Sequence, residues 1–221
     1  MTRSVALAVA AGLVLASCSS GKDGTSDAAS ASSSPSPTST VSVPEAVTVT
    51  EPGSELSFGE TAAVIFEPTQ NRGSVLELTV KKATKGSVKD FSGFILDDYT
   101  KAATPYYVDV TVKNVGAGDV GGVPVPLWGV DADNTLLPAA TFKSRFRLCP
   151  SEPLPKKFAA GASMDTCLVY LAPDHGTLDG VSFRPNQEFN PISWTGDVAT
   201  PKPAPPKTSK KPARKRSGKR Q

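Results

Sequence analysis

The chain has 221 residues, of which 38% are hydrophobic, 20% are charged and 20 are proline. One His and two Met, one of them the initiator, exclude His-rich and Met-rich metal sites, so we expect no metal and no other cofactor. The net charge of +3 conceals an acidic body and a basic tail. Residues 44–198 carry 13 Lys/Arg against 19 Asp/Glu, whereas residues 199–221 carry nine Lys/Arg and no acid.

The first eighteen residues are predicted to direct export. Arg3 gives a positive start, and residues 5–16 are an uninterrupted run of apolar and small residues. A bilayer core needs about 20 such residues, so this shorter run is typical of a signal peptide. It ends in Leu-Ala-Ser-Cys18, which resembles the lipobox of bacterial lipoproteins. The resemblance implies that residues 1–17 are removed and that Cys18 carries a diacylglycerol anchor. An ordinary secretory signal with a chance Cys is the alternative.

Residues 18–43 are predicted to be a disordered tether that begins at the lipidated Cys18. Thirteen of residues 19–43 are Ser or Thr, and large apolar side chains are almost absent. Such a segment has too little apolar surface to form a core. A solvated spacer is the simpler interpretation of the Ser-Pro stretch at 34–40, and O-glycosylation is the alternative.

Residues 44–198 are predicted to be one all-β domain. Apolar and polar side chains alternate at every second residue, as in half-buried strands, and turn-forming sequences separate the runs. Seven or eight antiparallel strands in a domain of this size predict a β-sandwich. No amphipathic helix of ten or more residues interrupts the pattern. The residues on one face of each run are Val64, Phe66, Leu76, Leu78, Val80, Tyr106, Val108, Val110, Val112, Val125, Leu127, Cys167, Val169, Leu171, Val181, Phe183, Ile192 and Trp194.

An odd number of cysteines in an exported chain needs an explanation. If Cys18 carries the lipid, Cys149 and Cys167 remain, and an exported compartment permits them to pair. Closing a loop of about 18 residues would stabilise the fold by about 3 kcal/mol. The alternative, a redox-active pair, lacks both a CxxC spacing and a nearby base.

Two stretches of the body carry a family resemblance. Tyr-Tyr-Val-Asp-Val-Thr-Val-Lys-Asn-Val-Gly at 106–116 is followed by Lys-Phe-Ala-Ala-Gly-Ala-Ser-Met-Asp-Thr-Cys-Leu-Val-Tyr-Leu-Ala-Pro at 157–173. Together with residues 180–185 and 191–194, they resemble a family of immunoglobulin-like, telokin-like lipoproteins of actinobacterial cell envelopes. The resemblance covers about residues 53–197. It implies an immunoglobulin-like β-sandwich at the cell surface and no catalytic residues, and it does not extend to the basic tail.

Two turns within these stretches have a physical explanation of their own. Asn114 ends a valine-rich strand, where a residue that tolerates left-handed geometry is expected. Gly161 is expected to set a turn before the strand that contains Cys167.

The motifs that would suggest chemistry are weak, so we expect no enzyme. His175 lies in Pro-Asp-His-Gly, a sequence typical of a solvated turn between strands. Ser163 lacks the second glycine of a nucleophile elbow and precedes a strand instead of a helix. Asp131-Ala-Asp133-Asn134 suggests calcium, but it lacks the glycine and the distant Glu of an EF-hand loop. A hairpin turn is the better interpretation.

Residues 86–104 form a long loop for a sandwich. They contain Phe91, Phe94, Ile95 and Tyr99. The loop therefore either packs over one end of the sandwich, which we favour, or makes a binding surface.

Residues 199–221 are predicted to be an extended, disordered polycation. Such a tail favours anionic lipids or cell-wall polymers, and a merely solubilising tail is the alternative. Export removes nucleic acid as a physiological partner. The residues predicted to bind a polyanion are Lys210, Lys211, Arg214, Lys215, Arg216, Lys219 and Arg220.

These features predict a non-catalytic lipoprotein on the extracellular face of the cell membrane. Its domain would bind an envelope component or a partner protein. The alternative is a structural bridge from membrane to cell wall, made by the lipid anchor and the polycationic tail.

Overall fold

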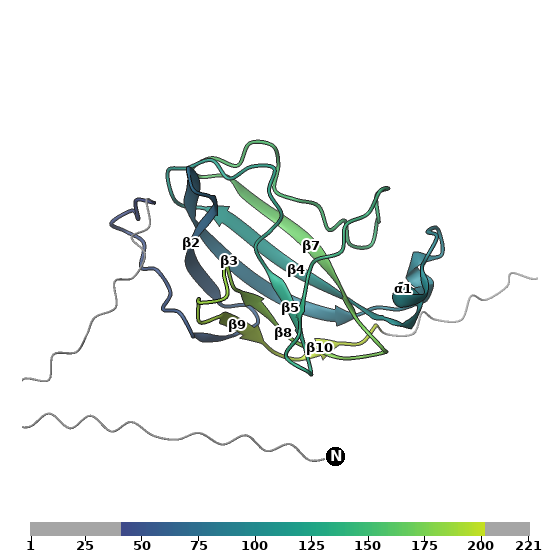
Figure 1. The fold of residues 1–221 in the computed structure, drawn as a ribbon. Helices are drawn as coiled ribbons and strands as arrows, with labels where there is room; N and C mark the ends of the chain where they lie inside the picture. The colour runs from purple at the N-terminus through teal and green to yellow at the C-terminus, as the bar shows by residue number, and fades with distance from the viewer. Residues whose placement is uncertain (1–40, 202–221) are drawn as a thin grey trace, which may run out of the picture. The chain divides into compact units, whose positions relative to one another are not determined.

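The longest alternating runs of the sequence form the longest strands. The computed structural model describes residues 41–201, in which two five-stranded sheets pack face to face (Figure 1). The first, the long-strand sheet, consists of β2 (Thr61–Thr69), β3 (Arg72–Lys85), β4 (Thr104–Asn114), β7 (Ser163–Ala172) and β10 (Val198–Ala199). The second, the short-strand sheet, has the order β1 (Glu55–Ser57), β9 (Ile192–Thr195), β8 (Leu178–Phe183), β5 (Trp128–Asp131) and β6 (Leu136–Leu137). The predicted β-sandwich is confirmed.

The number and direction of strands differ from the prediction. The described residues contain ten strands instead of seven or eight, because β1, β6 and β10 are only two or three residues long. The sandwich is also not purely antiparallel, since β1 runs parallel to β9 and β10 runs parallel to β3. Both parallel strands lie next to points where the chain crosses between sheets. There the Phe58 N–H donates to the Thr195 carbonyl at 2.9 Å. Strands this short leave no periodic pattern to detect.

A β-bulge in β3 changes which residues face the core. The register with β4 shifts between Val80 and Lys82, so β3 contains an extra residue there. Before the bulge Leu76, Leu78 and Val80 are fully buried, and after it the next buried residue is Ala83. The extra residue moves the inward face from even to odd positions.

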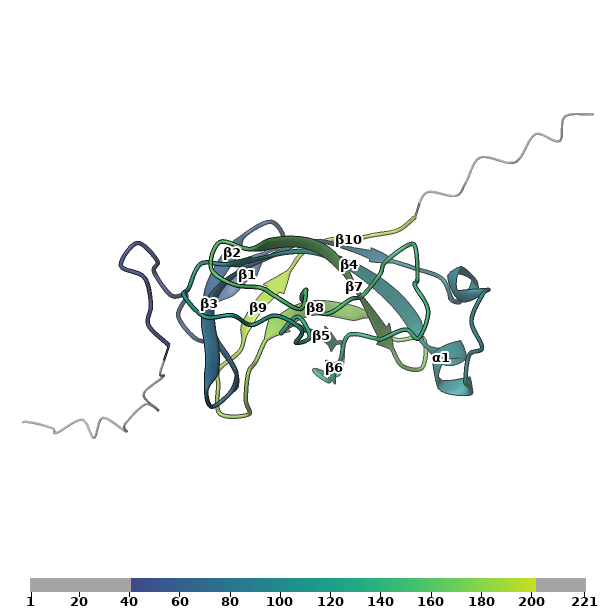
Figure 2. The ribbon, with the colours of Figure 1, turned by 90° about the horizontal axis from the view of Figure 1, so that it is seen from above.

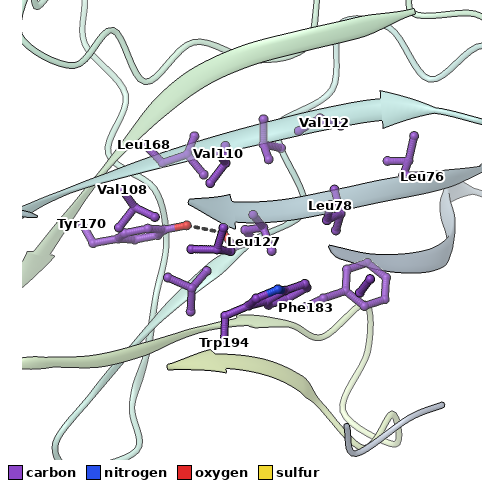
Figure 3. Packing of buried hydrophobic residues seen from close by; sticks show 14 of the residues in the cluster. Leu76, Leu78, Val108, Val110, Val112, Leu127, Leu168, Tyr170, Phe183 and Trp194 are labelled. Atoms are coloured by element: carbon purple, nitrogen blue, oxygen red, sulfur yellow. Dashed lines mark hydrogen bonds between the residues drawn. The ribbon is translucent and has the colours of Figure 1, made fainter. Parts of the chain in front are cut away.

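The main core fills the space between the two sheets (Figure 3). Its two largest polar-tipped side chains are hydrogen-bonded, as burial requires. The Tyr170 O–H donates to the Leu127 carbonyl at 3.0 Å, and the Trp194 indole N–H donates to the Glu60 carbonyl at 3.0 Å. Predicted inward residues of six runs belong to this core, but Val125 and Leu127 lie before β5 and not in a strand.

The predicted inward face of β7 is wrong. Leu168, Tyr170 and Ala172 face the main core. Cys167 and Val169 point to the opposite side, where a second cluster buries them with Phe91, Phe146 and Cys149. Both faces of β7 are therefore covered, so alternation alone cannot indicate which face meets the other sheet.

This second cluster, hereafter the outer cluster, is covered by two segments at one end of the sandwich. One contains a 3₁₀ turn, η1 (Val88–Phe91), and a short helix, α1 (Asp98–Ala102), which Figure 2 shows at that end. The other runs from about residue 140 to 149. Phe91 and Phe94 of the long loop pack here, as expected, whereas Ile95 and Tyr99 remain exposed.

The described residues extend past both predicted domain boundaries. Ala199, assigned to the tail from the sequence, is the last residue of β10. Val41, assigned to the tether, packs closely against Gly73. A β-carbon added to Gly73 would lie only 2.5 Å from a methyl group of Val41. No helix within residues 41–201 is long and apolar enough to cross a bilayer.

Candidate functional site

The two cysteines expected to pair do so. Cys149 and Cys167 form a disulfide with their Cα atoms 5.0 Å apart, which confirms the predicted bond. It fixes the segment before Cys149 to the outward face of β7. The residue predicted to carry the lipid and the tail cations predicted to bind a polyanion lie outside the described residues: Cys18, Lys210, Lys211, Arg214, Lys215, Arg216, Lys219 and Arg220.

The weak catalytic and metal motifs adopt the structural roles that the sequence favoured. His175 is exposed in the turn between β7 and β8, and its backbone N–H donates to the Ala102 carbonyl. One carboxylate oxygen of Asp131 accepts from the backbone N–H groups of Asp133 and Thr135, which closes the hairpin of β5 and β6. Within residues 41–201, no group of three or more His, Cys, Asp or Glu is placed to hold a metal.

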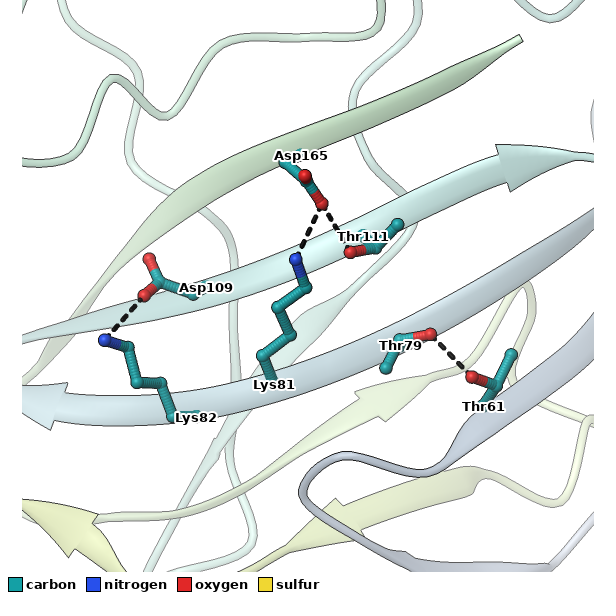
Figure 4. A network of polar contacts seen from close by, with 7 residues as sticks. All are labelled: Thr61, Thr79, Lys81, Lys82, Asp109, Thr111 and Asp165. Atoms are coloured by element: carbon teal, nitrogen blue, oxygen red, sulfur yellow. Dashed lines mark hydrogen bonds and ion pairs between the residues drawn. The ribbon is translucent and has the colours of Figure 1, made fainter.

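The part of the outward face of the long-strand sheet that the outer cluster leaves open is polar, and charged side chains pair on it (Figure 4). Lys81 on β3 reaches across β4 to Asp165 on β7 at 2.7 Å, and Thr111 between them donates to the same carboxylate at 2.6 Å. These two hydrogen bonds lower the pKa of Asp165. Lys82 on β3 pairs with its direct neighbour Asp109 on β4 at 3.2 Å. Because these charges neutralise one another, this face does not qualify as a charged binding site.

The strongest candidate site is an apolar groove of about 510 Å³, hereafter the proline groove. It lies where the end of β2, the segments 123–128 and 138–141, and the residues after β8 meet. Trp128 lines it and is 37% exposed, which is unusual for so large an apolar side chain. Among residues 41–201, Arg184 is the only charged residue that lines it. Five of its lining residues are proline: Pro68, Pro124, Pro126, Pro138 and Pro185.

The segment that leads into β5 builds one wall of the groove by alternation. Val125 and Leu127 point into the main core, and the Tyr170 hydroxyl fixes Leu127 by its carbonyl. Pro124, Pro126 and Trp128 are the more exposed residues of this run and project toward the groove, which Val125 and Leu127 also line. The alternation in the sequence predicted that Val125 and Leu127 are buried, but it assigned no function to Pro124, Pro126 and Trp128.

Two side chains hold the start of this segment in place. The Asn114 side chain is buried, and its amide donates to the carbonyls of Gly118 and Phe158 at 2.7 Å each. The Asp119 carboxylate accepts from the backbone N–H groups of Phe158 and Gly121, which lowers the pKa of Asp119. The chain therefore enters the groove wall from a fixed loop.

Asn114 does not have the left-handed conformation expected of it, since its φ is not positive. Its side-chain hydrogen bonds explain its position instead. The glycines that follow it are needed for close backbone approach: a β-carbon on Gly118 would lie 1.9 Å from the Gly73 carbonyl oxygen. Gly161, by contrast, does have a positive φ of 78° and forms the predicted turn before β7.

The walls of the groove restrict what it can bind. Proline has no backbone N–H, so the proline-rich walls cannot pair with a ligand as an added β-strand would. They offer apolar contact, a Trp ring and the Arg184 guanidinium, one nitrogen of which donates to the Gln187 carbonyl at 2.8 Å. No acid in the described part of the chain lines the groove. Such walls suit an extended apolar ligand that has few unsatisfied donors of its own.

Comparison with known proteins gives little further information. No protein-family model matches the chain, and no curated protein matches it in sequence. A solved structure that is similar is a secreted protein from Mycobacterium tuberculosis, MPT63, at 12% sequence identity and a TM-score of 0.43. The similarity covers 64% of this chain and 96% of that one. The assignment of the domain as a β-sandwich therefore rests on its own two sheets.

Proposed function

We propose that the chain is a non-catalytic binding module, and that the proline groove holds a proline-rich, extended segment of a partner protein. The observation that carries the proposal is the exposed Trp128 set among five prolines and one arginine, without an acid. A proline-rich segment is extended before it binds and presents few N–H groups, so it needs few hydrogen-bond acceptors from the walls. Its carbonyl groups can stay in contact with water at the open side of the groove. A tryptophan ring stacks well on proline rings, and Arg184 favours an acidic residue or a terminal carboxylate in the ligand.

The groove contains a natural reporter for this proposal. The chain has two tryptophans, and the other one, Trp194, is fully buried. Titration with a synthetic decaproline peptide should therefore shift the emission of Trp128 to shorter wavelength and leave that of Trp194 unchanged. In the Trp128→Phe variant the shift should disappear. Saturable binding of the peptide with no change in Trp128 emission would place the site elsewhere.

Affinity for the same peptide, measured by anisotropy of a labelled copy, tests the role of the ring. A central aromatic anchor contributes about 1–2 kcal/mol or more, so Trp128→Ala should weaken binding about tenfold. Tyr99→Ala is the matched control, because Tyr99 is an exposed aromatic residue outside the groove. Equal affinity of both variants would contradict the proposal.

We further propose that the domain is exported and held at the extracellular face of the membrane by a lipid on Cys18. The proposal rests on the sequence of residues 1–18, with its short apolar run and a Cys after Leu-Ala-Ser. Two or more acyl chains would make such anchoring stable. A Cys18→Ala chain should leave the membrane fraction and change in electrophoretic mobility. Retention there with unchanged mobility would refute the anchor.

A structural bridge from membrane to wall is the second candidate function. The observation that favours it is the concentration of nine cations and no acid in residues 199–221. Removing residues 201–221 distinguishes the two functions. Bridging should be lost, whereas binding of a protein by the groove should survive.

A further inference from the structure

The domain also carries a basic surface loop, which is separate from the apolar proline groove. Residues 142–149, hereafter the cation loop, are mostly exposed, with two buried side chains among them. Phe146 and Cys149 are buried in the outer cluster, whereas Lys143, Arg145 and Arg147 are exposed. Three cations within five residues therefore stand on one exposed loop.

The backbone of the cation loop is held at both ends and in the middle. Before it, the Ala140 N–H donates to the Val169 carbonyl at 2.7 Å. At its end the disulfide joins Cys149 to Cys167 on β7. In its middle the ring of Phe146 stacks on that of Phe91, with centroids 4.8 Å apart. The backbone at Arg145 and Arg147, on either side of Phe146, is therefore held in place before any ligand binds.

The cations of the loop are not neutralised within residues 41–201. The four ion pairs of this region involve Lys81, Lys82, Lys101 and Lys113, and none involves the cation loop. Arg145 and Arg147 together line an open hollow of about 480 Å³, and no acid among residues 41–201 lines it. Arg145 also borders a neighbouring hollow with Asp109, Glu152 and Asp165, but forms no ion pair with any of them. A domain with 19 acids and 13 bases in residues 44–198 thus keeps its loop cations unpaired.

We propose that the cation loop is a binding site for a polymer of repeated phosphate groups. Arginine presents a planar fork of N–H donors that fits two oxygens of one phosphate, and two forks on one hollow can hold neighbouring phosphates. Lys143 adds a point charge beside them. The site is independent of the proline groove, with which it shares no lining residue.

A membrane surface fits the loop less well than a free polymer. Ile95, which is fully exposed, and Tyr99 belong to the adjacent segment. Asp97 and Asp98 lie between them, and Asp98 is fully exposed although it pairs with Lys101. An anionic bilayer would repel these carboxylates, and inserting them beside the apolar side chains would be costly. A polymer can contact the arginine hollow without burying the acids.

Binding of inorganic polyphosphate to the full chain at about 150 mM salt tests this site. The nine cations of residues 199–221 are first replaced by Ser, so that the tail does not mask the loop. Each phosphate contact by a cation is worth about fivefold in affinity, so Arg145→Ser with Arg147→Ser should weaken binding at least tenfold. Lys156→Ser with Lys157→Ser removes the same charge from two exposed residues and should change affinity less than about twofold.

Two further arms identify what the site recognises. Arg145→Lys with Arg147→Lys keeps the charge and removes the forks, and it should lose a large part of the affinity. Polyglutamate of equal charge and phosphatidylglycerol vesicles should bind less well than polyphosphate. The proposal would be overturned if Lys156→Ser with Lys157→Ser lost as much affinity as Arg145→Ser with Arg147→Ser, because binding would then follow net charge alone. Tighter binding to the vesicles than to polyphosphate would overturn the proposal in favour of a membrane surface. Melting temperatures equal to that of the parent chain serve as the control that every variant is folded.

Discussion

Asn114 has a fully buried side chain that makes four hydrogen bonds. Its amide donates to the carbonyls of Gly118 and Phe158, and its carbonyl oxygen accepts from the Ser74 hydroxyl and the Gly116 N–H. It thereby satisfies two stretches of backbone, residues 116–118 and Phe158, and the Ser74 hydroxyl, beside the loop that leads to the proline groove. A buried residue that satisfies several partners is difficult to replace, because each orphaned partner loses its bond without regaining water.

Asn114→Ala should therefore lower the free energy of unfolding by about 3 kcal/mol or more, measured by urea denaturation. Asn186 is the matched control, since its side chain accepts two backbone N–H bonds but is exposed. Asn186→Ala should cost less than about 1 kcal/mol. Similar losses in the two variants would show that the buried network contributes little.

Single residues were predicted well where one physical demand fixed their role. Cys149 and Cys167 had to pair or stay free, and the structure pairs them. Asp131 and His175 lay in sequences that favour turns, and turns are what they form. Asn114 was misinterpreted because its sequence context suggests backbone geometry. Its long-range partners, Phe158 and Ser74, are invisible to any local pattern.

At the scale of elements, the disulfide and the outer cluster act together. The bond ties the cation loop to β7, and four phenylalanine rings pack beside it, with Phe142 and Phe146 at 5.1 Å between centroids. The loop itself has no strand or helix. Its order therefore depends on side-chain packing and on this cross-link.

Replacing both cysteines by serine should lower the free energy of unfolding by about 3 kcal/mol, as expected for a loop of this length. The measurement is urea unfolding of the native and Cys149→Ser, Cys167→Ser chains. Reducing agent should destabilise the native chain by a similar amount and leave the variant unchanged. A variant as stable as the native chain would mean that the outer cluster alone orders the loop.

Strands were predictable to the extent that one face was apolar and the other polar. β3 and β4 meet that condition for most of their length, up to the bulge at Lys81. β7 does not, because the long loop covers its outer face with phenylalanines that alternation cannot place. β1 and β10 escaped detection since two or three residues carry no period.

At the scale of the whole molecule, the proposed partners sit on different parts of the chain. The proline groove is apolar, the cation loop is basic, and the paired outer face of the long-strand sheet is neutral. The groove could not be predicted from sequence, because Pro68, Trp128 and Pro185 come together only when the two sheets close. The cation loop was visible in the sequence as Lys143, Arg145 and Arg147, but only the structure shows that a disulfide and the stacked Phe146 hold its two arginines on one hollow.

The most direct test of the central claim, that the proline groove binds a partner protein, is cross-linking in intact cells. A photoreactive residue at Thr141, on the groove wall, is placed in the native chain, in the Trp128→Ala chain and in a chain ending at Thr200. We predict one cross-linked protein with a proline-rich segment at the site of attachment, lost in Trp128→Ala and retained in the shortened chain. The same product at undiminished yield in Trp128→Ala would contradict the account.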